Sequence, residues 1–300
     1  MKVMKKLSPV VLFSLLAGSV IAQRLDRHNV LLFSLSQKTD STWQTGAARF
    51  LTAFNSKGYN NQPAFFGPNE IYLTAQTPDD TTQTDIWLLD LGSLTRTRVT
   101  ATTATSEYSP TLMPGGKRFS AVRVEEDGAQ RLWSFPVDRS DNGRPEFPRL
   151  FNVGYHCWLR DTLAAFFIVG EGTDPHLLQL VGTKTQKPQR IASNIGRCLL
   201  RTGGGSLAFI QKATEQTWFL KTYDLKKQNS DIVVKMPIGS EDFAILPDGA
   251  YLASLGAKLF QYHPRRDADW KEVADLTKYG VKSISRLTAS KEGKLAIVVQ

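Results

Sequence analysis

Six polar residues that could do chemistry recur along this 300-residue chain at nearly regular intervals. Each stands directly before an apolar or thiol-bearing residue, and the six followers are 47, 47, 41, 45 and 44 positions apart. The followers are Pro63, Pro110, Cys157, Cys198, Phe243 and Leu287. The polar residues are Gln62, Ser109, His156, Arg197, Asp242 and Arg286. Gathered in one place, their amide, hydroxyl, imidazole, guanidinium and carboxylate groups could bind a small polar ligand or a peptide terminus.

The elements that would position these residues are short strands separated by turns. A recurrence of roughly 40 to 50 residues in such units is typical of a β-propeller with one four-stranded antiparallel blade per repeat. Because alternate strand residues face opposite sides, we expect the apolar row to pack between blades and the polar row to gather near the axial funnel, where the inner strands begin. A structural alternative stays open, since polar residues of a wet channel also satisfy inner-strand backbone groups.

Runs of five to seven apolar or alternating residues between turn formers predict the individual strands. The first two repeats predict strands at 62–66, 70–76, 85–91 and 96–100, then 109–113, 118–124, 131–137 and 149–153. The next two predict 157–159, 163–169, 176–181 and 189–192, then 198–200, 207–211, 218–224 and 231–235. The fifth predicts 243–246, 251–255, 258–262 and 271–274.

The sixth repeat supplies only two strands, at 285–289 and 294–299, before the sequence stops. The missing pair is found near the other end, at 29–35 and 49–54. We therefore expect the N-terminal strands to complete the last blade, which closes the ring and hides the edges that open sheets would expose.

The first 22 residues have the pattern of a secretory signal peptide. Three lysines precede an apolar run at 10–21, and Val20, Ile21 and Ala22 offer a cleavage site. The run is too short for a convincing membrane span. We expect residues 23–300 to form a single propeller domain that is exported to the periplasm or secreted.

The net charge is moderately basic. The formal charge is +9, and the three lysines of the signal segment account for three of those charges. The basic residues are scattered, with loop clusters at Lys184, Lys187 and Arg190 and at Arg265 and Arg266. This distribution favours solvated outer loops over a nucleic-acid site.

Several turns and strands resemble those of a known family. The segments LPDGAYLAS (246–254), MPGGKRFSA (113–121) and DIWLLDL (85–91) look like the PD40 or WD40-like repeats of TolB-like six-bladed propellers. Repeats three, four and six depart from the pattern, because other residues replace Pro-Asp-Gly in their turns. The resemblance implies an exported binding or scaffold protein of the cell envelope, without a cofactor, and its motif carries no catalytic residue.

A metal-dependent hydrolase is the alternative that the propeller fold suggests. Some six-bladed propellers are lactonases with carboxylate and Asn ligands near the axis. Just before the polar row stand Asn60, Asn61, Glu107, Tyr108, Tyr155 and Glu241. The Asn and Glu residues of this set, with Asp242, could offer oxygen ligands to Ca²⁺. The sequence contains neither a G-x-S-x-G motif nor a closely spaced histidine pair.

The two cysteines occupy equivalent positions of neighbouring repeats. Export to an oxidising compartment would allow Cys157 and Cys198 to form a disulfide. Equivalent side chains of rotated blades do not face each other, however, and a disulfide needs converging Cβ vectors. We therefore expect two buried free thiols.

Taken together, the residues predict an all-β, non-catalytic propeller that works as a monomer. Its partner would be an envelope protein, and neither nucleic acid nor a metal is expected. The candidate site is the polar row with its neighbours, and His156 is the first residue to mutate.

Overall fold

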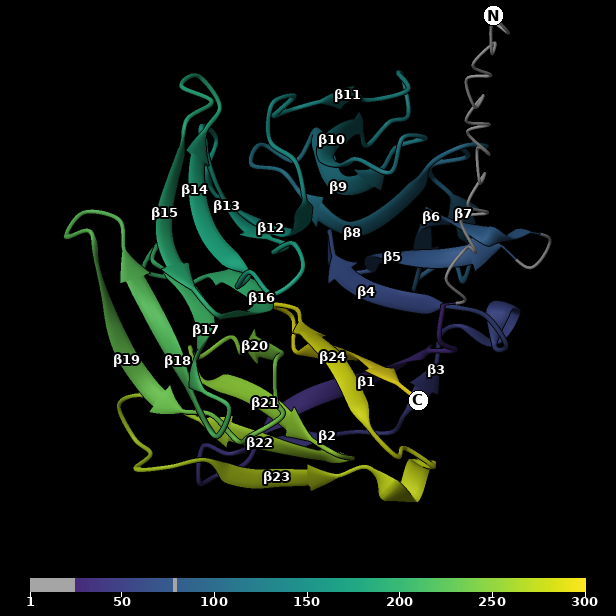
Figure 1. The fold of residues 1–300 in the computed structure, drawn as a ribbon. Coiled ribbons are helices and arrows are strands. Elements are labelled where there is room, and N and C mark those ends of the chain that lie inside the picture. The colour runs from purple at the N-terminus through teal and green to yellow at the C-terminus, as the bar shows by residue number, and fades with distance from the viewer. Residues whose placement is uncertain (1–24, 78–79) are drawn as a thin grey trace, which may run out of the picture.

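Antiparallel strands assemble into six sheets that stand around a common axis (Figure 1). The computed structural model describes residues 25–77 and 80–300. Five of the sheets have four strands, and the sixth has five. The strand of each sheet nearest the axis is β4 (Asn60–Phe65), β8 (Ser106–Leu112), β12 (Val153–Arg160), β16 (Ile195–Arg201), β20 (Phe243–Ile245) or β24 (Ile284–Ala289). This arrangement is a six-bladed β-propeller, as the repeats predicted.

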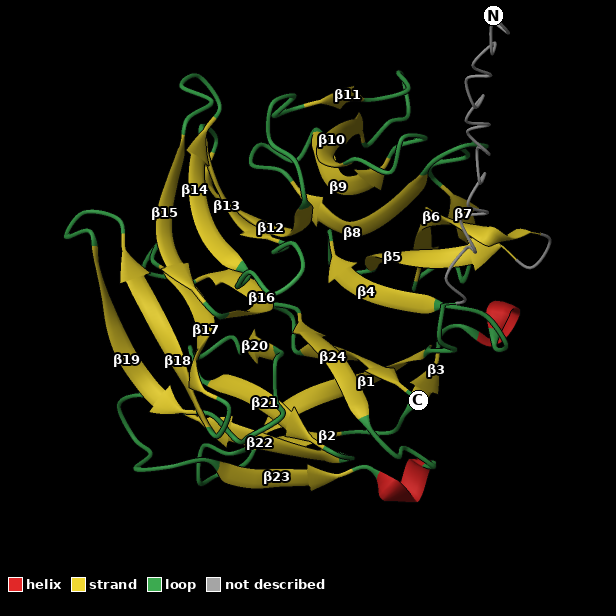
Figure 2. Ribbon diagram, in the orientation of Figure 1, coloured by secondary structure: helices red, strands yellow, loops and turns green. Residues whose placement is uncertain are grey.

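Each inner strand is followed in sequence order by the rest of its blade. Blade one adds β5 (Glu70–Thr77), β6 (Asp80–Asp90) and β7 (Arg96–Arg98), and blade two adds β9 (Arg118–Val124), β10 (Gln130–Pro136) and β11 (Arg144–Pro145). Blade three adds β13 (Leu163–Ile168), β14 (Leu177–Gly182) and β15 (Pro188–Ser193), and blade four adds β17 (Leu207–Thr214), β18 (Thr217–Asp224) and β19 (Asn229–Lys235). Blade five adds β21 (Tyr251–Leu255), β22 (Lys258–Tyr262) and β23 (Lys271–Asp275). Two short 3₁₀ turns, η1 (Ala53–Asn55) and η2 (Thr277–Tyr279), interrupt this pattern (Figure 2).

The sixth blade joins the two ends of the described chain. Strand β1 (Asn29–Gln37) pairs antiparallel with β25 (Lys294–Val299), in a register that runs from Asn29 opposite Val299 to Ser34 opposite Lys294. The outer edge of β1 pairs with both β2 (Trp43–Thr45) and β3 (Arg49–Phe50). Closure of the ring by N-terminal strands is therefore confirmed, although the outer position is shared by two short strands rather than held by one at 49–54.

One predicted strand of the second blade is wrong. The outer strand lies at β11, not at 149–153, and Val153 instead begins the next inner strand. The segment between them carries Phe147, which is fully buried in the core between blades two and three. Pro148 adds a residue without an N–H donor for a strand ladder. The apolar residues there are buried in a connection between blades. Their sequence pattern alone does not distinguish such a buried connection from a strand.

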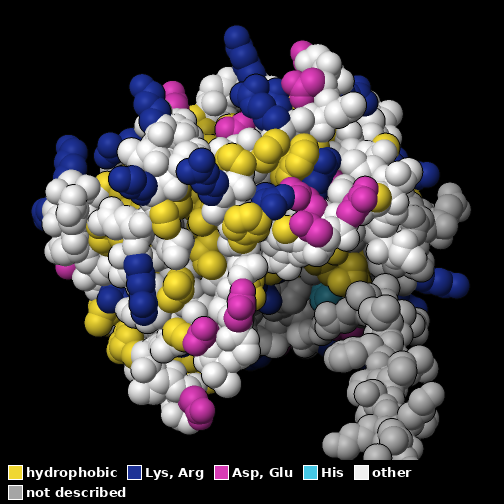
Figure 3. Space-filling model, turned by 45° about the horizontal axis from the view of Figure 1, so that its top comes forward, with side chains coloured by type: hydrophobic (Ala, Val, Ile, Leu, Met, Phe, Trp, Pro, Cys, Tyr) yellow, Lys and Arg dark blue, Asp and Glu magenta, His cyan; other side chains and the backbone are white. Residues whose placement is uncertain are grey.

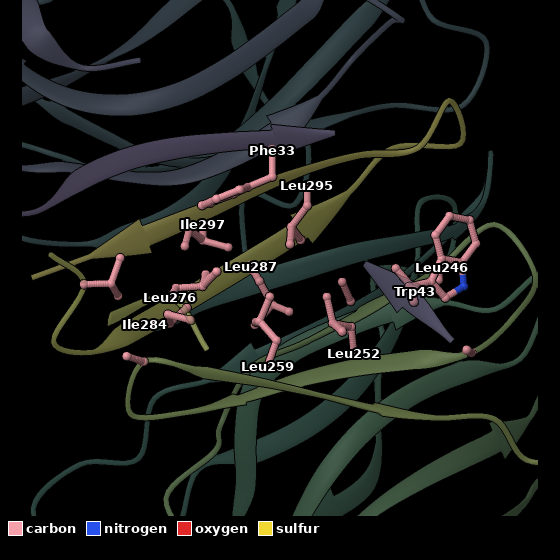
Figure 4. Packing of buried hydrophobic residues seen from close by; sticks show 14 residues of the cluster. Phe33, Trp43, Leu246, Leu252, Leu259, Leu276, Ile284, Leu287, Leu295 and Ile297 are labelled. Atoms are coloured by element: carbon pink, nitrogen blue, oxygen red, sulfur yellow. The ribbon is translucent and has the colours of Figure 1, made fainter. Parts of the chain in front are cut away.

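Six hydrophobic clusters fill the six gaps between neighbouring blades. Strand β5 shows how the pleat produces this arrangement. Ile71 and Leu73 face the cluster shared with blade six, while Tyr72, between them in sequence, faces the cluster shared with blade two. Figure 4 shows the cluster between blades five and six, where Phe33 and Leu295 come from one blade and Leu252 from the other. Fully burying a side chain of this kind contributes roughly 1.5–3 kcal/mol.

The Pro-Asp-Gly turn between β20 and β21 shows why the repeats fold as hairpins. Gly249 has a φ of +87°, which an L side chain would adopt only with strain. The backbone N–H of Leu246 donates to the Ala250 carbonyl at 2.8 Å, and the Asp248 carboxylate accepts from the Ala250 N–H at 3.1 Å. The same carboxylate accepts the Trp43 indole N–H at 3.2 Å, which ties this turn to blade six.

The surface carries its charges in a dispersed way. On the face that Figure 3 shows, Lys and Arg side chains are spread out, with acidic side chains between some of them. Among the residues that the structure describes, no helix is both long and apolar enough to span a membrane. The predicted signal peptide lies outside the described residues.

Candidate functional site

A cavity of about 760 Å³ lies on the axis of the ring, with a wall formed by residues from all six inner strands and the turns that follow them. It begins at the level of the polar row and continues toward the turns between inner and second strands. Gly203, Pro247 and Lys291 line it at that end, where they are exposed. The cavity therefore reaches solvent on the face that carries these turns.

All six members of the polar row lie on the wall of this cavity, and Tyr155 joins them. The apolar row takes part in two environments at once. Cys157, Phe243 and Leu287 belong to inter-blade clusters, as predicted, and they also line the cavity. The inner strands thus present two consecutive levels of side chains to the axis, one polar and one apolar.

The charged side of the polar row is built around Asp242, which is only 7% exposed. Its Oδ2 lies 3.5 Å from Nε of Arg197 and 3.6 Å from a guanidinium nitrogen of Arg286, so one carboxylate serves two cations. Burial raises the pKa of Asp242, while Arg286 and Arg197 act in the opposite direction. Arg286 also donates a hydrogen bond to the Tyr155 hydroxyl and lies 4.7 Å from the centre of that ring.

The neutral side of the row is built around His156, which is 6% exposed. Its Nε2 lies 2.6 Å from the Ser120 hydroxyl, and that oxygen also accepts the Trp158 indole N–H at 2.9 Å. Burial lowers the pKa of His156 to about 3, so the ring is neutral at pH 7. The other ring nitrogen, Nδ1, has no hydrogen-bond partner within the part of the chain that the structure describes.

Gln62 and Ser109 hold equivalent places at bulges in β4 and β8. Both have left-handed backbones, with φ of +54° and +56°, a conformation that costs a non-glycine residue of order 1 kcal/mol. The Ser109 N–H donates to Gln62 Oε1 at 3.2 Å and to the Thr74 hydroxyl at 3.1 Å. Side chains of blade one thus hold the strained backbone of blade two at the cavity wall.

Five of the expected site residues do not lie on this wall but have contacts beside it. Asn60 donates to the backbone carbonyls of His28 and Asn55, and Asn61 accepts the Gln62 N–H. Glu241 pairs with Lys212, and the Tyr108 ring lies edge-on to Tyr59. Glu107 is fully buried, where it accepts from Arg123 Nε at 2.8 Å and from the Thr105 hydroxyl at 2.8 Å.

These five residues mark the end of the ring where the inner strands begin, and the cavity extends away from that end. Tyr59, which is 9% exposed, lies there with its ring edge-on to both His28 and Tyr108. The six residues of the polar row do gather at one cavity on the axis, while Tyr108 packs against Tyr59 beside it. Whether this cavity is a functional site stays a prediction.

The two thiols lie in neighbouring blades on the cavity wall. The Cys198 thiol lies 3.2 Å from the Phe243 carbonyl oxygen, and the Cys157 thiol lies 3.8 Å from the Trp158 carbonyl oxygen. Burial raises the pKa of Cys157 to about 12 and that of Cys198 well above its usual value. Both cysteines are unpaired in the structure, and their oxidation state stays a prediction.

Sequence reasoning missed two cationic residues at the outer end of the cavity, Arg201 and Lys291. Arg201 follows Arg197 by four residues on β16, and Lys291 lies in the turn after β24. Simple alternation could not have found Arg201, because the pairing of β16 shifts register between Ile195 and Leu199, a stretch that includes Arg197. Across the described ranges, 25–77 and 80–300, no three His, Cys, Asp or Glu side chains converge as a metal site.

Solved structures share this fold at low sequence identity. A putative TolB from Agrobacterium tumefaciens matches with a TM-score of 0.67 at 10% identity, over 91% of this chain and 98% of that one. TolB from Acinetobacter baumannii gives 0.55 at 12% identity, over 91% of this chain and 64% of the other. An oligogalacturonate lyase in complex with manganese gives 0.56 at 12% identity, over 80% and 70% of the two chains.

The chain therefore has a TolB-like six-bladed β-propeller fold, as the resemblance of its turns implied. At these identities the likeness establishes the fold alone. Neither a protein-family model nor a curated protein sequence matches the chain.

Proposed function

We propose that this protein is an exported, non-catalytic propeller that binds an envelope partner at the face onto which the central cavity opens. The observation that carries this proposal is the cavity itself, a preformed recess within a rigid ring and surrounded by exposed turns. Loops held by a rigid scaffold are the usual place for recognition. The TolB structures of the same fold agree with an envelope role, and the sequence of residues 1–22 agrees with export.

The pairing of the acidic groups supports binding rather than catalysis. A general base needs a carboxylate that can take up a proton from a substrate. Glu107 and Glu241 are each engaged by one basic side chain, and Asp242 is engaged by two. Each carboxylate of the candidate site thus already serves a structural contact.

The test is capture of a partner from envelope extracts by the purified protein. The informative variant is Arg201→Glu with Lys291→Glu, which reverses two exposed charges at the cavity mouth. The matched control is Lys278→Glu, on the exposed turn η2 at the end of the ring where the inner strands begin. We expect one protein to be captured by the wild type and the control, and to be lost with the double variant. Equal capture by all three would contradict the proposal.

A metal-dependent hydrolase is the alternative proposal, with Asp242 as its remaining cavity carboxylate. It predicts a rise in Tm on adding Ca²⁺, since a ligand that binds only the native state stabilises it by about 2.7 kcal/mol at a hundredfold excess over Kd. A Ca²⁺-dependent rise that chelator reverses and Asp242→Asn abolishes would favour the hydrolase. No shift would favour the binding protein.

A further inference from the structure

The wall of the central cavity has an unequal charge. Among the described residues that line it, four are basic and one is acidic. The acidic residue is Asp242, and the basic ones are Arg197, Arg201, Arg286 and Lys291. A recess lined by one sign of charge concentrates ions of the opposite sign. The cavity should therefore attract anions.

The inner end of the cavity has cationic hydrogen-bonding capacity that its one carboxylate does not use up. Asp242 faces Arg197 and Arg286 at 3.5 and 3.6 Å, distances longer than a charge-assisted hydrogen bond. Arg197 Nε makes no hydrogen bond among the residues that the structure describes. Other nitrogens are already used, since Arg197 donates to the Ser285 carbonyl and Arg286 to the Tyr155 hydroxyl. The guanidinium nitrogens that these contacts leave over are suited to a second, planar oxyanion.

The middle of the cavity is different, because apolar side chains separate the two cationic levels. Phe243, Leu287 and Leu199 line it there, with Ala64 and Ala244. Arg201 lies four residues beyond Arg197 on β16, which is at most about 13 Å along the strand because the pairing shifts register between Ile195 and Leu199. A ligand that fills this space meets cations at the inner end, an apolar wall, and cations again at the mouth.

We propose that the cavity binds an amphipathic carboxylate, with its carboxylate against Arg197 and Arg286 and its hydrocarbon body along the apolar wall. A second carboxylate at the far end of such a ligand meets Arg201 and Lys291. This inference rests on the proposed binding role of the cavity, to which it adds a ligand class. The volume of about 760 Å³ lies within the range of small-molecule sites.

The experiment is a calorimetric titration of the purified protein with octanoate, with its neutral analogue octanamide, and with the diacid sebacate. We expect octanoate to bind at least tenfold more tightly than octanamide, because a charge-assisted hydrogen bond is worth about that factor. Sebacate should bind more tightly than octanoate, since it also reaches the mouth. Equal affinity for octanoate and octanamide, or no binding of octanoate at millimolar concentration, would overturn the proposal.

Three variants locate the effect. Arg197→Gln should weaken octanoate binding about tenfold, and Lys184→Gln, which removes an equal charge from an exposed residue outside the cavity lining, should not change it. Asp242→Asn removes the competing carboxylate and should tighten octanoate binding, an outcome that a damaged fold would not produce. If Arg197→Gln and Lys184→Gln bind octanoate equally, the proposed site is wrong.

The outcome is separable from that of the proposed function. Loss of partner capture in the double variant at the mouth, together with no carboxylate binding, would leave the binding protein standing and remove this ligand class. Carboxylate binding without partner capture would support this ligand class and remove the proposed partner-binding role.

Discussion

At the scale of single residues, the cavity wall holds ionisable groups whose pKa values are displaced by burial. His156 is the clearest case, because its pKa falls from 6.5 to about 3 and desolvation is the only cause. A histidine that cannot take up a proton in the folded state acts here as a neutral hydrogen-bonding group. The sequence left both a functional and a structural histidine open and favoured the structural one, and in the structure the ring contacts Ser120.

This shift predicts that stability falls with acid. Below about pH 6.5 the unfolded chain binds a proton at His156 that the folded protein does not bind until about pH 3, so unfolding is favoured as the pH falls through this window. The contribution between pH 7 and pH 5 is about 2 kcal/mol. Urea unfolding at the two pH values should show this loss in the wild type and a smaller loss in His156→Gln. An identical loss in both would show that His156 is not responsible.

The two cysteines give a second prediction at this scale. Since both thiol pKa values are raised by burial, we expect no reaction with iodoacetamide in the folded protein at pH 7. After denaturation without reductant, both Cys157 and Cys198 should be labelled, as mass measurement would show. Labelling only after reduction would mean that they form a disulfide.

At the scale of elements, buried ion pairs fix the connections between blades. Glu107, on β8, pairs with Arg123, on β9, and the Arg123 guanidinium lies 4.0 Å from the centre of the Trp133 ring. The Glu107 carboxylate also accepts from Thr102 and Thr105, so it holds the chain between blades one and two. Glu107, which the sequence offered as a possible metal ligand, therefore has a structural role in the connection between blades one and two.

Replacing Glu107 with Gln should destabilise the protein by about 3–5 kcal/mol, because Arg123 would be left as a buried charge without its partner. The matched control is Asp141→Asn, which breaks the exposed pair with Arg118. That change should have little effect on the free energy of unfolding. Chemical denaturation of the three proteins makes the comparison. Equal stability of the two variants would contradict the role given to Glu107.

The strands were predictable wherever alternation and turn chemistry agreed. Pro247, Asp248 and Gly249 identify a hairpin because their backbone preferences match its geometry. The outer strand of blade two was missed because Phe147 is buried in a connection, which has no period of its own. The position of Tyr108 beside the cavity, not on its wall, was missed for a similar reason, since it depends on packing against Tyr59 of the neighbouring blade.

At the scale of the whole molecule, stability depends on closing the ring. Val30 on β1 is fully buried opposite Val298 and packs into the cluster shared by blades six and one. A defect there removes the contact that joins the first described strand to the last. No blade beside the gap can compensate, because each inter-blade cluster is formed by its own pair of sheets.

Val30→Asp should therefore lower the free energy of unfolding by at least about 3 kcal/mol, as a buried carboxylate without a partner is costly. Ile232→Asp on β19 is the control, since Ile232 is 60% exposed. Thermal unfolding should show one cooperative transition, shifted far more by the first change than by the second. Similar shifts would indicate that ring closure contributes little.

Photo-crosslinking tests most directly whether the cavity mouth is where this propeller meets its partner. A photoreactive amino acid at Gly203 is well suited, because a Cβ there would meet no atom within 4 Å. The same group at Lys278, on the exposed turn η2 at the opposite end of the ring, is the control. We expect a crosslink to one envelope protein from position 203 and none from position 278. The same protein crosslinked from both positions, or from 278 alone, would contradict this expectation.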